Sequence, residues 1–212
     1  MKIALPRLPL VLENIDPTLV DDGASLERCH LEDMDLTGSS LRSVSLDEVK
    51  LERVLFPRAS LENLSVQDAI LKSCDMSATQ CSGLSFLRVA IDGGRMSGWD
   101  CSRGTLRDVV FTNCKLDMAN FRFAKLTLVK FVGCIFTDAD FLNGELSDVY
   151  FEDCLLERTE FNQCTMKNVD LRTSQLVEIR GWKYLKGAII DNVQLMSAAP
   201  YLAGEVGIRV VD

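Results

Sequence analysis

The chain has 212 residues, of which 23 are Lys or Arg and 31 are Asp or Glu, for a formal charge of −8, and 47% are hydrophobic. An apolar fraction of this size is typical of a globular protein and excludes a disordered tail. The acidic balance disfavours nucleic acid as a direct ligand, because phosphate binding needs a surface of clustered Lys and Arg.

The N-terminal residues 1–23 contain apolar side chains interrupted by Pro6, Arg7 and Pro9. A signal peptide needs an unbroken apolar stretch, so this segment does not fit one. No part of the chain approaches the roughly 20 apolar residues that span a bilayer. We therefore expect a cytoplasmic protein that does not enter a membrane, and an N-terminal cap over residues 1–23 formed by Leu8, Leu10, Leu12, Ile15 and Leu19.

From Leu26 to Leu176 every fifth residue is large and apolar: all thirty-one positions hold Leu, Phe, Ile, Val, Met or Cys. The residue two positions before each is mostly small, and the other three positions carry nearly all the charge. A period of five suits neither an α-helix at 3.6 nor a flat strand at 2. It predicts one continuous solenoid, not two domains.

Like side chains also recur twenty residues apart. If four five-residue sides close one square coil, residues twenty apart stack on neighbouring coils at the parallel-strand spacing of about 4.8 Å. The sequence therefore predicts a right-handed quadrilateral β-helix whose interior holds columns of Phe111, Phe131 and Phe151, of Phe121, Phe141 and Phe161, and of Cys114, Cys134 and Cys154.

This pattern resembles the pentapeptide repeat proteins, whose consensus is a small residue, Asp or Asn, Leu or Phe, and two variable residues. Ala119-Asn120-Phe121 and Ala139-Asp140-Phe141 match that consensus fully. The resemblance covers residues 24–190. It implies an all-β, right-handed quadrilateral parallel β-helix.

Residues 191–212 follow a slip in the register, because Leu185 and Ile190 take over the apolar positions one residue early. Asp191 is a good N-cap and Gly207 a C′ stop, so we expect a C-terminal helix, which Pro200 kinks or divides, and then a short strand over residues 208–211.

The apolar face of this helix covers the last coil or forms a homodimer contact. Resemblance to the quinolone-resistance members, whose C-terminal helix joins two solenoids end to end, implies the homodimer. The predicted cap or dimer residues are Leu195, Met196, Ala199, Leu202, Ala203 and Val206.

One coil breaks the pattern. Residues 91–100 contain three glycines and place the bulky Trp99 where a small inward residue belongs. One interpretation is an irregularity of packing. The other is a glycine-permitted bulge that turns Trp99 outward as an anchor for a partner.

No residue pattern indicates catalysis. The single histidine, His30, falls at an outward position, and a filled solenoid offers no pocket in which a third group could orient it. The sequence has no phosphate loop, HExxH helix or nucleophile elbow. All eight cysteines fall in inward columns without a CxxC pair, which favours buried free thiols over zinc or disulfides. We expect a protein that is not an enzyme, with no catalytic residue, cofactor or metal.

Charge is banded along the chain, with a net charge of −6 over residues 21–80, +4 over 81–130 and −7 over 131–166.

Quinolone-resistance members imitate duplex DNA and bind DNA gyrase or topoisomerase IV, so the resemblance implies a type II topoisomerase as one partner. Against it, the basic band interrupts any mimicry of phosphates, and the unbroken register leaves no room for the inserted loops that some of those members use. The main prediction is therefore a rigid scaffold for an unidentified protein. The predicted partner-binding residues are Trp99 and the acidic belt, Asp138, Asp140, Glu145, Asp148, Glu152, Asp153, Glu157 and Glu160.

Overall fold

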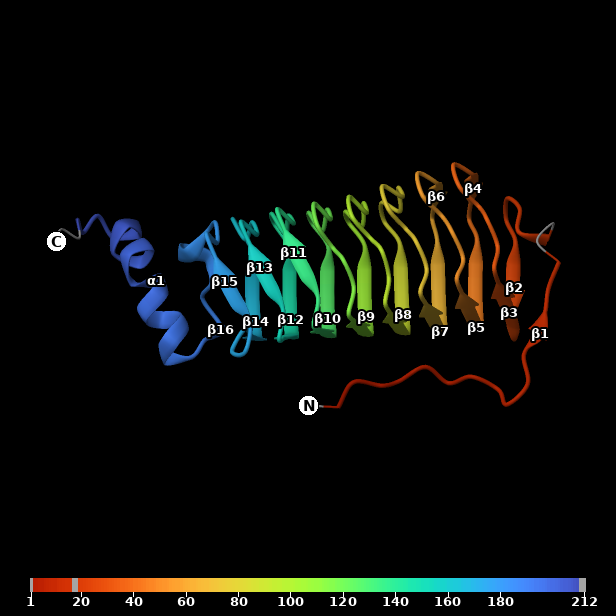
Figure 1. The fold of residues 1–212 in the computed structure, drawn as a ribbon, viewed down its shortest axis with the longest axis horizontal. Helices are drawn as coiled ribbons and strands as arrows, with labels where there is room; N and C mark the ends of the chain where they lie inside the picture. The colour runs from red at the N-terminus through yellow and green to blue at the C-terminus, as the bar shows by residue number, and fades with distance from the viewer. Residues whose placement is uncertain (1, 17–18, 210–212) are drawn as a thin grey trace.

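The computed structural model describes residues 2–16 and 19–209 and shows a right-handed quadrilateral β-helix with one α-helix at its C-terminal end (Figure 1). Strands on successive coils pair in parallel with an offset of twenty residues, so that Phe131 lies between Phe111 and Phe151. The predicted fold class and coil length are therefore confirmed.

Each coil carries one long strand that bends around a corner. These strands build the central sheet: β5 (Ser45–Glu52), β7 (Ser65–Lys72), β8 (Ser85–Asp92), β9 (Thr105–Thr112), β10 (Lys125–Val132), β12 (Glu145–Glu152) and β14 (Thr165–Asp170). Shorter strands complete the sheets: β1 (Glu13–Asn14), β2 (Ser25–Glu27), β3 (Cys29–Glu32), β4 (Ser40–Arg42), β6 (Ser60–Glu62), β11 (Ile135–Thr137), β13 (Leu155–Glu157), β15 (Gln175–Val177) and β16 (Ala188–Ile189).

The corners of the coil have a left-handed backbone. Every fifth residue from Arg28 to Glu178 has a φ near +50° or above, apart from a φ of +23° at Thr173, and most of these residues are not glycine. This conformation is uncommon for residues that carry a Cβ. It is held by backbone bonds between coils, as in Arg53 N to Lys72 O at 2.9 Å. The five-residue repeat is therefore one short extended side followed by one left-handed corner.

The apolar columns fill the interior. Every centre residue from Leu26 to Leu171 is buried except Leu36, which is half-buried. The rings of Phe121 and Phe141 stack with centroids 4.7 Å apart, and those of Phe111 and Phe131 at 4.8 Å. The predicted aromatic columns are confirmed, and the described cysteines are buried and free.

Several inward small residues are hydrogen-bond donors. Thr159 Oγ1 donates to Phe136 O at 2.8 Å, and Ser174 Oγ donates to Phe151 O at 2.9 Å. In both pairs the acceptor lies 23 residues earlier, so the bond joins neighbouring coils. A hydroxyl or thiol in the small column thereby satisfies a buried backbone carbonyl, which apolar periodicity does not reveal.

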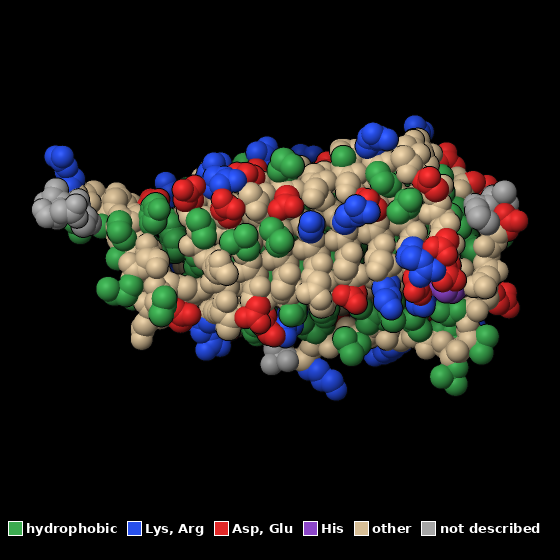
Figure 2. All heavy atoms as spheres, viewed as in Figure 1, with side chains coloured by type: hydrophobic (Ala, Val, Ile, Leu, Met, Phe, Trp, Pro, Cys, Tyr) green, Lys and Arg blue, Asp and Glu red, His purple; other side chains and the backbone are tan. Residues whose placement is uncertain are grey.

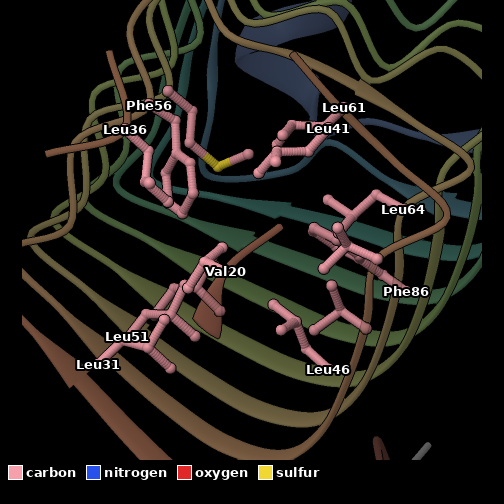
Figure 3. Close-up of a pocket in the computed structure, with 14 residues that line it drawn as sticks. Val20, Leu31, Leu36, Leu41, Leu46, Leu51, Phe56, Leu61, Leu64 and Phe86 are labelled. Atoms are coloured by element: carbon pink, nitrogen blue, oxygen red, sulfur yellow. The ribbon is translucent and has the colours of Figure 1, made fainter. Parts of the chain in front are cut away.

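The first coils are less completely filled. An apolar cavity of about 30 Å³ lies there, lined mainly by aliphatic side chains together with Phe56 and Phe86 (Figure 3). Val20 lines it together with Leu31 and Leu46. Together with the half-buried Ile15, Val20 covers the first coil.

The rest of the N-terminal segment differs from the expected cap. Its strand β1 pairs with β3, and the residues before it run back along the side of the rod (Figure 1). Leu10 is fully exposed and Leu19 is 55% exposed, so these two predicted cap residues do not cover the end. This segment lacks the five-residue repeat and contains prolines, which favour an extended backbone, so it does not continue the coil.

At the other end the predicted register slip is present, because β16 pairs with β14 at an offset of nineteen, Val169 with Ala188. A 3₁₀ turn, η2 (Trp182–Tyr184), precedes it, and the helix α1 (Asn192–Glu205) follows. Gly207 has a φ of +79°, and Ile208 N donates to Ala203 O at 2.8 Å, which is a Schellman end. Ile208 and Arg209 are not in a strand, and the rest of the predicted short strand lies outside the described residues.

Candidate interaction surfaces

The acidic belt surrounds the rod instead of forming one face. Because residues twenty apart stack, the position of a residue within the coil fixes the side on which it lies. The eight acids fall on all four sides, and Figure 2 shows acidic and basic side chains intermixed on the visible face. The structure therefore does not assemble the belt into a single acidic surface.

Basic residues partly neutralise the belt. Lys125 Nζ lies 3.2 Å from Glu145, and Lys130 Nζ lies 2.6 Å from Glu152, so the basic band pairs with the acidic coil next to it. These pairs join solvent-exposed groups, which contribute little to stability. They reduce the local negative charge that a basic partner would meet.

Arg158 neutralises a further corner of the belt. Its guanidinium lies 2.8 Å from Asp138 and also contacts Glu157. The hydrogen bond from Arg158 lowers the pKa of Asp138 below its ordinary value. This corner therefore carries two carboxylates and one guanidinium, for a net charge of −1.

Two belt residues have a structural role. Asp140 Oδ1 accepts from Leu142 N at 2.8 Å, and Glu160 Oε1 accepts from Asn162 N at 2.7 Å. Each carboxylate satisfies a backbone amide of its own turn, as Asx-type turns do. Arg122 also binds Asp140 at 2.6 Å. The bond from the carboxylate of Asp140 to the backbone amide two residues later gives a physical reason for Asp or Asn in the repeat consensus.

Three belt residues do lie on one side of the rod. Asp148, Glu152 and Asp153 occupy the strand β12 and the corner after it, and Asp153 is exposed. Glu152 also borders a shallow hollow with Tyr150 and Arg172. We name Asp148, Glu152 and Asp153 the β12 acidic side; it is the part of the predicted site that the structure brings together.

Trp99 is fully buried, so its interpretation as an exposed anchor is wrong. Its ring lies 5.8 Å from that of Phe121 and 6.1 Å from that of Phe86. The neighbouring centre positions hold the small Cys81 and Cys101, whereas later coils have Phe there. The large Trp99 in the small column thus takes the space that a Phe at the centre positions fills in later coils. The twenty-residue register continues through this coil without a bulge.

His30 is half-buried and lies beside carboxylates. Its Nε2 is 3.8 Å from Glu52, and Glu32 completes a group whose ligand atoms lie within 4.8 Å of one another. Arg53 already binds both carboxylates, at 2.5 Å from Glu32 and 2.9 Å from Glu52, and Lys50 also contacts Glu52. Two cations at these oxygens oppose the binding of a metal ion, so we interpret the group as an ion-pair network.

Two of the buried cysteines, Cys81 and Cys164, do not form a reactive thiolate at neutral pH. Burial raises the pKa of Cys81 and of Cys164 to about 12. Because the thiolate is the nucleophile, these thiols are unreactive at neutral pH.

The C-terminal helix binds the rod through a face different from the predicted one. Gln194 and Ala198 are its buried residues, and Gln194 Nε2 donates to Leu171 O at 2.6 Å and to Ser174 O at 2.7 Å. Among the predicted residues, Leu202 and Ala203 are half-buried, while the others are exposed: Leu195, Met196, Ala199 and Val206. A polar residue makes the main contact, which a search for apolar spacing could not find.

Comparison with known proteins agrees with this geometry, which is that of a β-solenoid with an end helix. A family model described as a pentapeptide repeat region matches residues 104–180, and one described as pentapeptide repeats, eight copies, matches residues 22–56. The chain belongs to the pentapeptide repeat proteins and is distantly related to Qnr.

A curated relative is the quinolone resistance pentapeptide repeat protein QnrB96 of Scandinavium goeteborgense, 30% identical over 98 residues, which are 46% of this chain and 44% of the relative. The match thus spans less than half of that protein. Similar solved structures are full-length QnrB1, a plasmid-mediated fluoroquinolone resistance protein (21% identity, 95% of this chain and 99% of that chain, TM-score 0.48), and HetL of the cyanobacterium Nostoc, involved in heterocyst differentiation regulation (18%, 79% and 90%, 0.40). Among the described residues, no helix is long and apolar enough to cross a membrane.

Proposed function

We propose that this chain is a non-enzymatic, cytoplasmic scaffold whose rigid rod presents outward side chains to another protein. The observation that carries the proposal is the filled interior. The cavity inside the solenoid, lined by Leu31, Leu46 and Phe56 among others, has about 30 Å³, whereas small-molecule sites have roughly 300–1,000 Å³. The larger hollows, such as the one beside Glu152, are open depressions on the surface of the rod. Repeated sides and corners around a packed core support surface recognition over chemistry.

The exposed C-terminal helix face supports a homodimer as part of this function. Met196 is 75% exposed and Val206 is 72% exposed, and both are apolar. Gln194 and Ala198 turn the opposite face of the helix to the rod. An apolar helix face that the chain itself does not cover is typical of a protein contact. Two copies joined through it would form one longer rod.

Capture of partners from a native cytoplasmic extract tests the scaffold function. The tagged wild-type chain is compared with a variant of the β12 acidic side, Asp148→Lys, Glu152→Lys and Asp153→Lys. A control variant makes the same change in net charge elsewhere, Glu27→Lys, Glu62→Lys and Glu178→Lys. We expect a discrete protein that the wild type retains and only one of the two variants loses. Retention of no protein above a bead control contradicts the scaffold.

A second candidate function is binding of DNA gyrase or topoisomerase IV, favoured by the match to QnrB96. The β12 acidic side is the surface that supports it, since it keeps three belt acids on one side of the rod, of which Glu152 is paired with Lys130. A gyrase supercoiling assay, with and without a fluoroquinolone, tests this candidate. Inhibition or drug protection by the wild type at low micromolar concentration supports it, provided that the β12 variant loses the effect and the control variant keeps it. No effect of the wild type excludes it.

A further inference from the structure

Residues 2–12, which we name the N-terminal strap, lie against the outside of the rod. Two backbone amides of the strap bind carboxylates of the solenoid: Ala4 N donates to Asp108 Oδ1 at 2.9 Å, and Arg7 N donates to Asp68 Oδ1 at 3.0 Å. In Figure 1 the strap runs from β1 past several coils. It therefore makes contacts unlike those of an end cap.

The two contacts fit the geometry of an extended chain. Asp68 and Asp108 occupy the same corner on coils two apart, at a separation of about 9.6 Å for the parallel-strand spacing. Three residues of extended backbone cover about 10 Å, which is the interval from Ala4 to Arg7. The strap thus runs along the rod axis with its amides in register with alternate coils.

The strap buries carboxylates that would otherwise face water. Asp68 is 4% exposed and Asp108 is 8% exposed, although both stand at outward corners, where Asp148 on the same column is half-buried. Asp residues are almost never fully buried without a partner. Arg88, on the coil between the two, donates to Asp68 Oδ1 at 2.7 Å and to Asp68 Oδ2 at 2.5 Å. Asp68 Oδ1 therefore accepts from both Arg88 Nε and the strap amide of Arg7.

The side of the rod beneath the strap is also more apolar than the rest. Half-buried apolar residues at outward positions of these coils include Ile70, Leu87, Ala90, Val110 and Leu128. Side chains alternate over residues 4–8 of the strap, because Ala4, Pro6 and Leu8 are half-buried while Leu5 and Arg7 are exposed. This period of two is that of an extended peptide with one face against the rod.

We propose that this corner is a binding site for an extended apolar segment of a partner protein, and that the strap occupies the site in cis. The site recognises two backbone amides three residues apart and small or aliphatic side chains at alternate positions. The strap is replaceable by such a segment because it contributes none of its described side chains to the solenoid interior. Leu10, fully exposed, and Val11, 79% exposed, show how little of the strap is buried.

The test frees the site without altering it. In the full-length chain, Ala4→Pro together with Arg7→Pro removes both donors, because proline lacks a backbone N–H, and leaves Asp68 and Asp108 intact. Leu5→Pro is the matched control, since Leu5 is 66% exposed and lies between the two anchors. A fluorescent synthetic peptide of residues 2–12 is titrated into each protein and followed by anisotropy. We expect at least tenfold tighter peptide binding to the double proline variant than to the wild type or the control.

Substitution of the anchors then locates the binding. In the double proline background, Asp68→Ala with Asp108→Ala removes the two acceptors, and Asp148→Ala is the control from the same corner column. We expect at least a tenfold loss of peptide affinity for the first and no change for the second, with thermal melts showing that all variants are folded. Equal peptide binding by the wild type and the freed variant overturns the proposal, as does a loss that both alanine sets share.

Discussion

At the scale of single residues, an inward side chain is defined by its place in the five-residue unit and an outward one by its partner on the next coil. Phe141 and Phe123 illustrate this, since they are the same residue type and differ only in register. Phe141 is fully buried between two stacked rings, whereas Phe123 is 47% exposed at a corner.

Replacement of Phe141 by Ala should destabilise the fold by about 3–5 kcal/mol, because it removes a buried ring and leaves a cavity between coils. Phe123→Ala should change the free energy of unfolding by no more than about 0.5 kcal/mol. Urea unfolding followed by circular dichroism measures both. Similar losses for the two variants would contradict the inward assignment of the column.

Asp68 leads to a prediction about pH. Its hydrogen bond from Arg88 lowers the pKa of this carboxyl below the ordinary value of 3.8. A group with a lowered folded-state pKa stabilises the fold above its unfolded pKa, and this contribution is lost as the pH falls through the folded value. Asp68→Ala should therefore cost about 1.5–3 kcal/mol at pH 5 to 8, and the difference from the wild type should shrink below pH 4.

Unfolding free energies measured across this pH range test the assignment. Asp148→Ala is the control, because Asp148 stands at the same corner beyond the strap contacts. A difference between wild type and Asp68→Ala that grows on acidification would contradict the lowered pKa.

At the scale of elements, the repeat could be predicted almost completely from sequence and the two ends only in part. From Leu26 to Leu176 the same five-residue pattern recurs, and each copy indicates the same backbone. One irregular copy therefore does not change the predicted fold. The strap and the C-terminal helix occur once. Their contacts depend on Asp68, Asp108 and Gln194, polar residues whose partners lie more than twenty positions away and leave no period.

Trp99 shows the same limit inside the repeat. Its environment depends on which neighbours have become small, and Cys81 and Cys101 compensate for it from another column. The sequence could not show how the acidic belt is arranged in space, for a related reason. A net charge counted along the chain ignores that a quadrilateral coil distributes consecutive acids over four sides and places Lys125 and Lys130 beside them.

Gln194 tests how the end helix is held. Its amide donates to two buried carbonyls, and its Oε1 accepts from Asp191 N in a capping box. Gln194→Ala should cost about 2–4 kcal/mol in docking of the helix, because it leaves Leu171 O and Ser174 O unpaired and weakens the cap.

Hydrogen exchange of the α1 amides should accelerate in this variant before any change in the solenoid. Ser197→Ala, on the exposed side of the same helix, is the control and should leave exchange unaltered. Unchanged protection of α1 in Gln194→Ala would show that apolar contacts alone hold it.

At the scale of the whole molecule, the rod is a stack in which each coil contacts its neighbours, so its ends decide what it assembles with. The N-terminal end is closed by Ile15 and Val20, with the strap folded back along one side. The C-terminal end is closed by Gln194 and Ala198, and the far face of α1 keeps its apolar residues in water. The two ends are thus unequal, and the exposed apolar face of α1 is the surface on which we propose a two-fold contact.

Multi-angle light scattering of the wild type should therefore give twice the 23.6 kDa of one chain at micromolar concentration. Met196→Lys with Val206→Lys should return the mass to that of one chain, because a lysine on each partner places like charges in the contact. The melting temperature of the solenoid should not fall, because the two side chains are 75% and 72% exposed. Val11→Lys is the control, since Val11 is 79% exposed but lies on the strap, away from α1. A wild type that remains monomeric, or a double variant that keeps the dimeric mass, would exclude the helix as the dimer contact and leave its exposed face for a different protein.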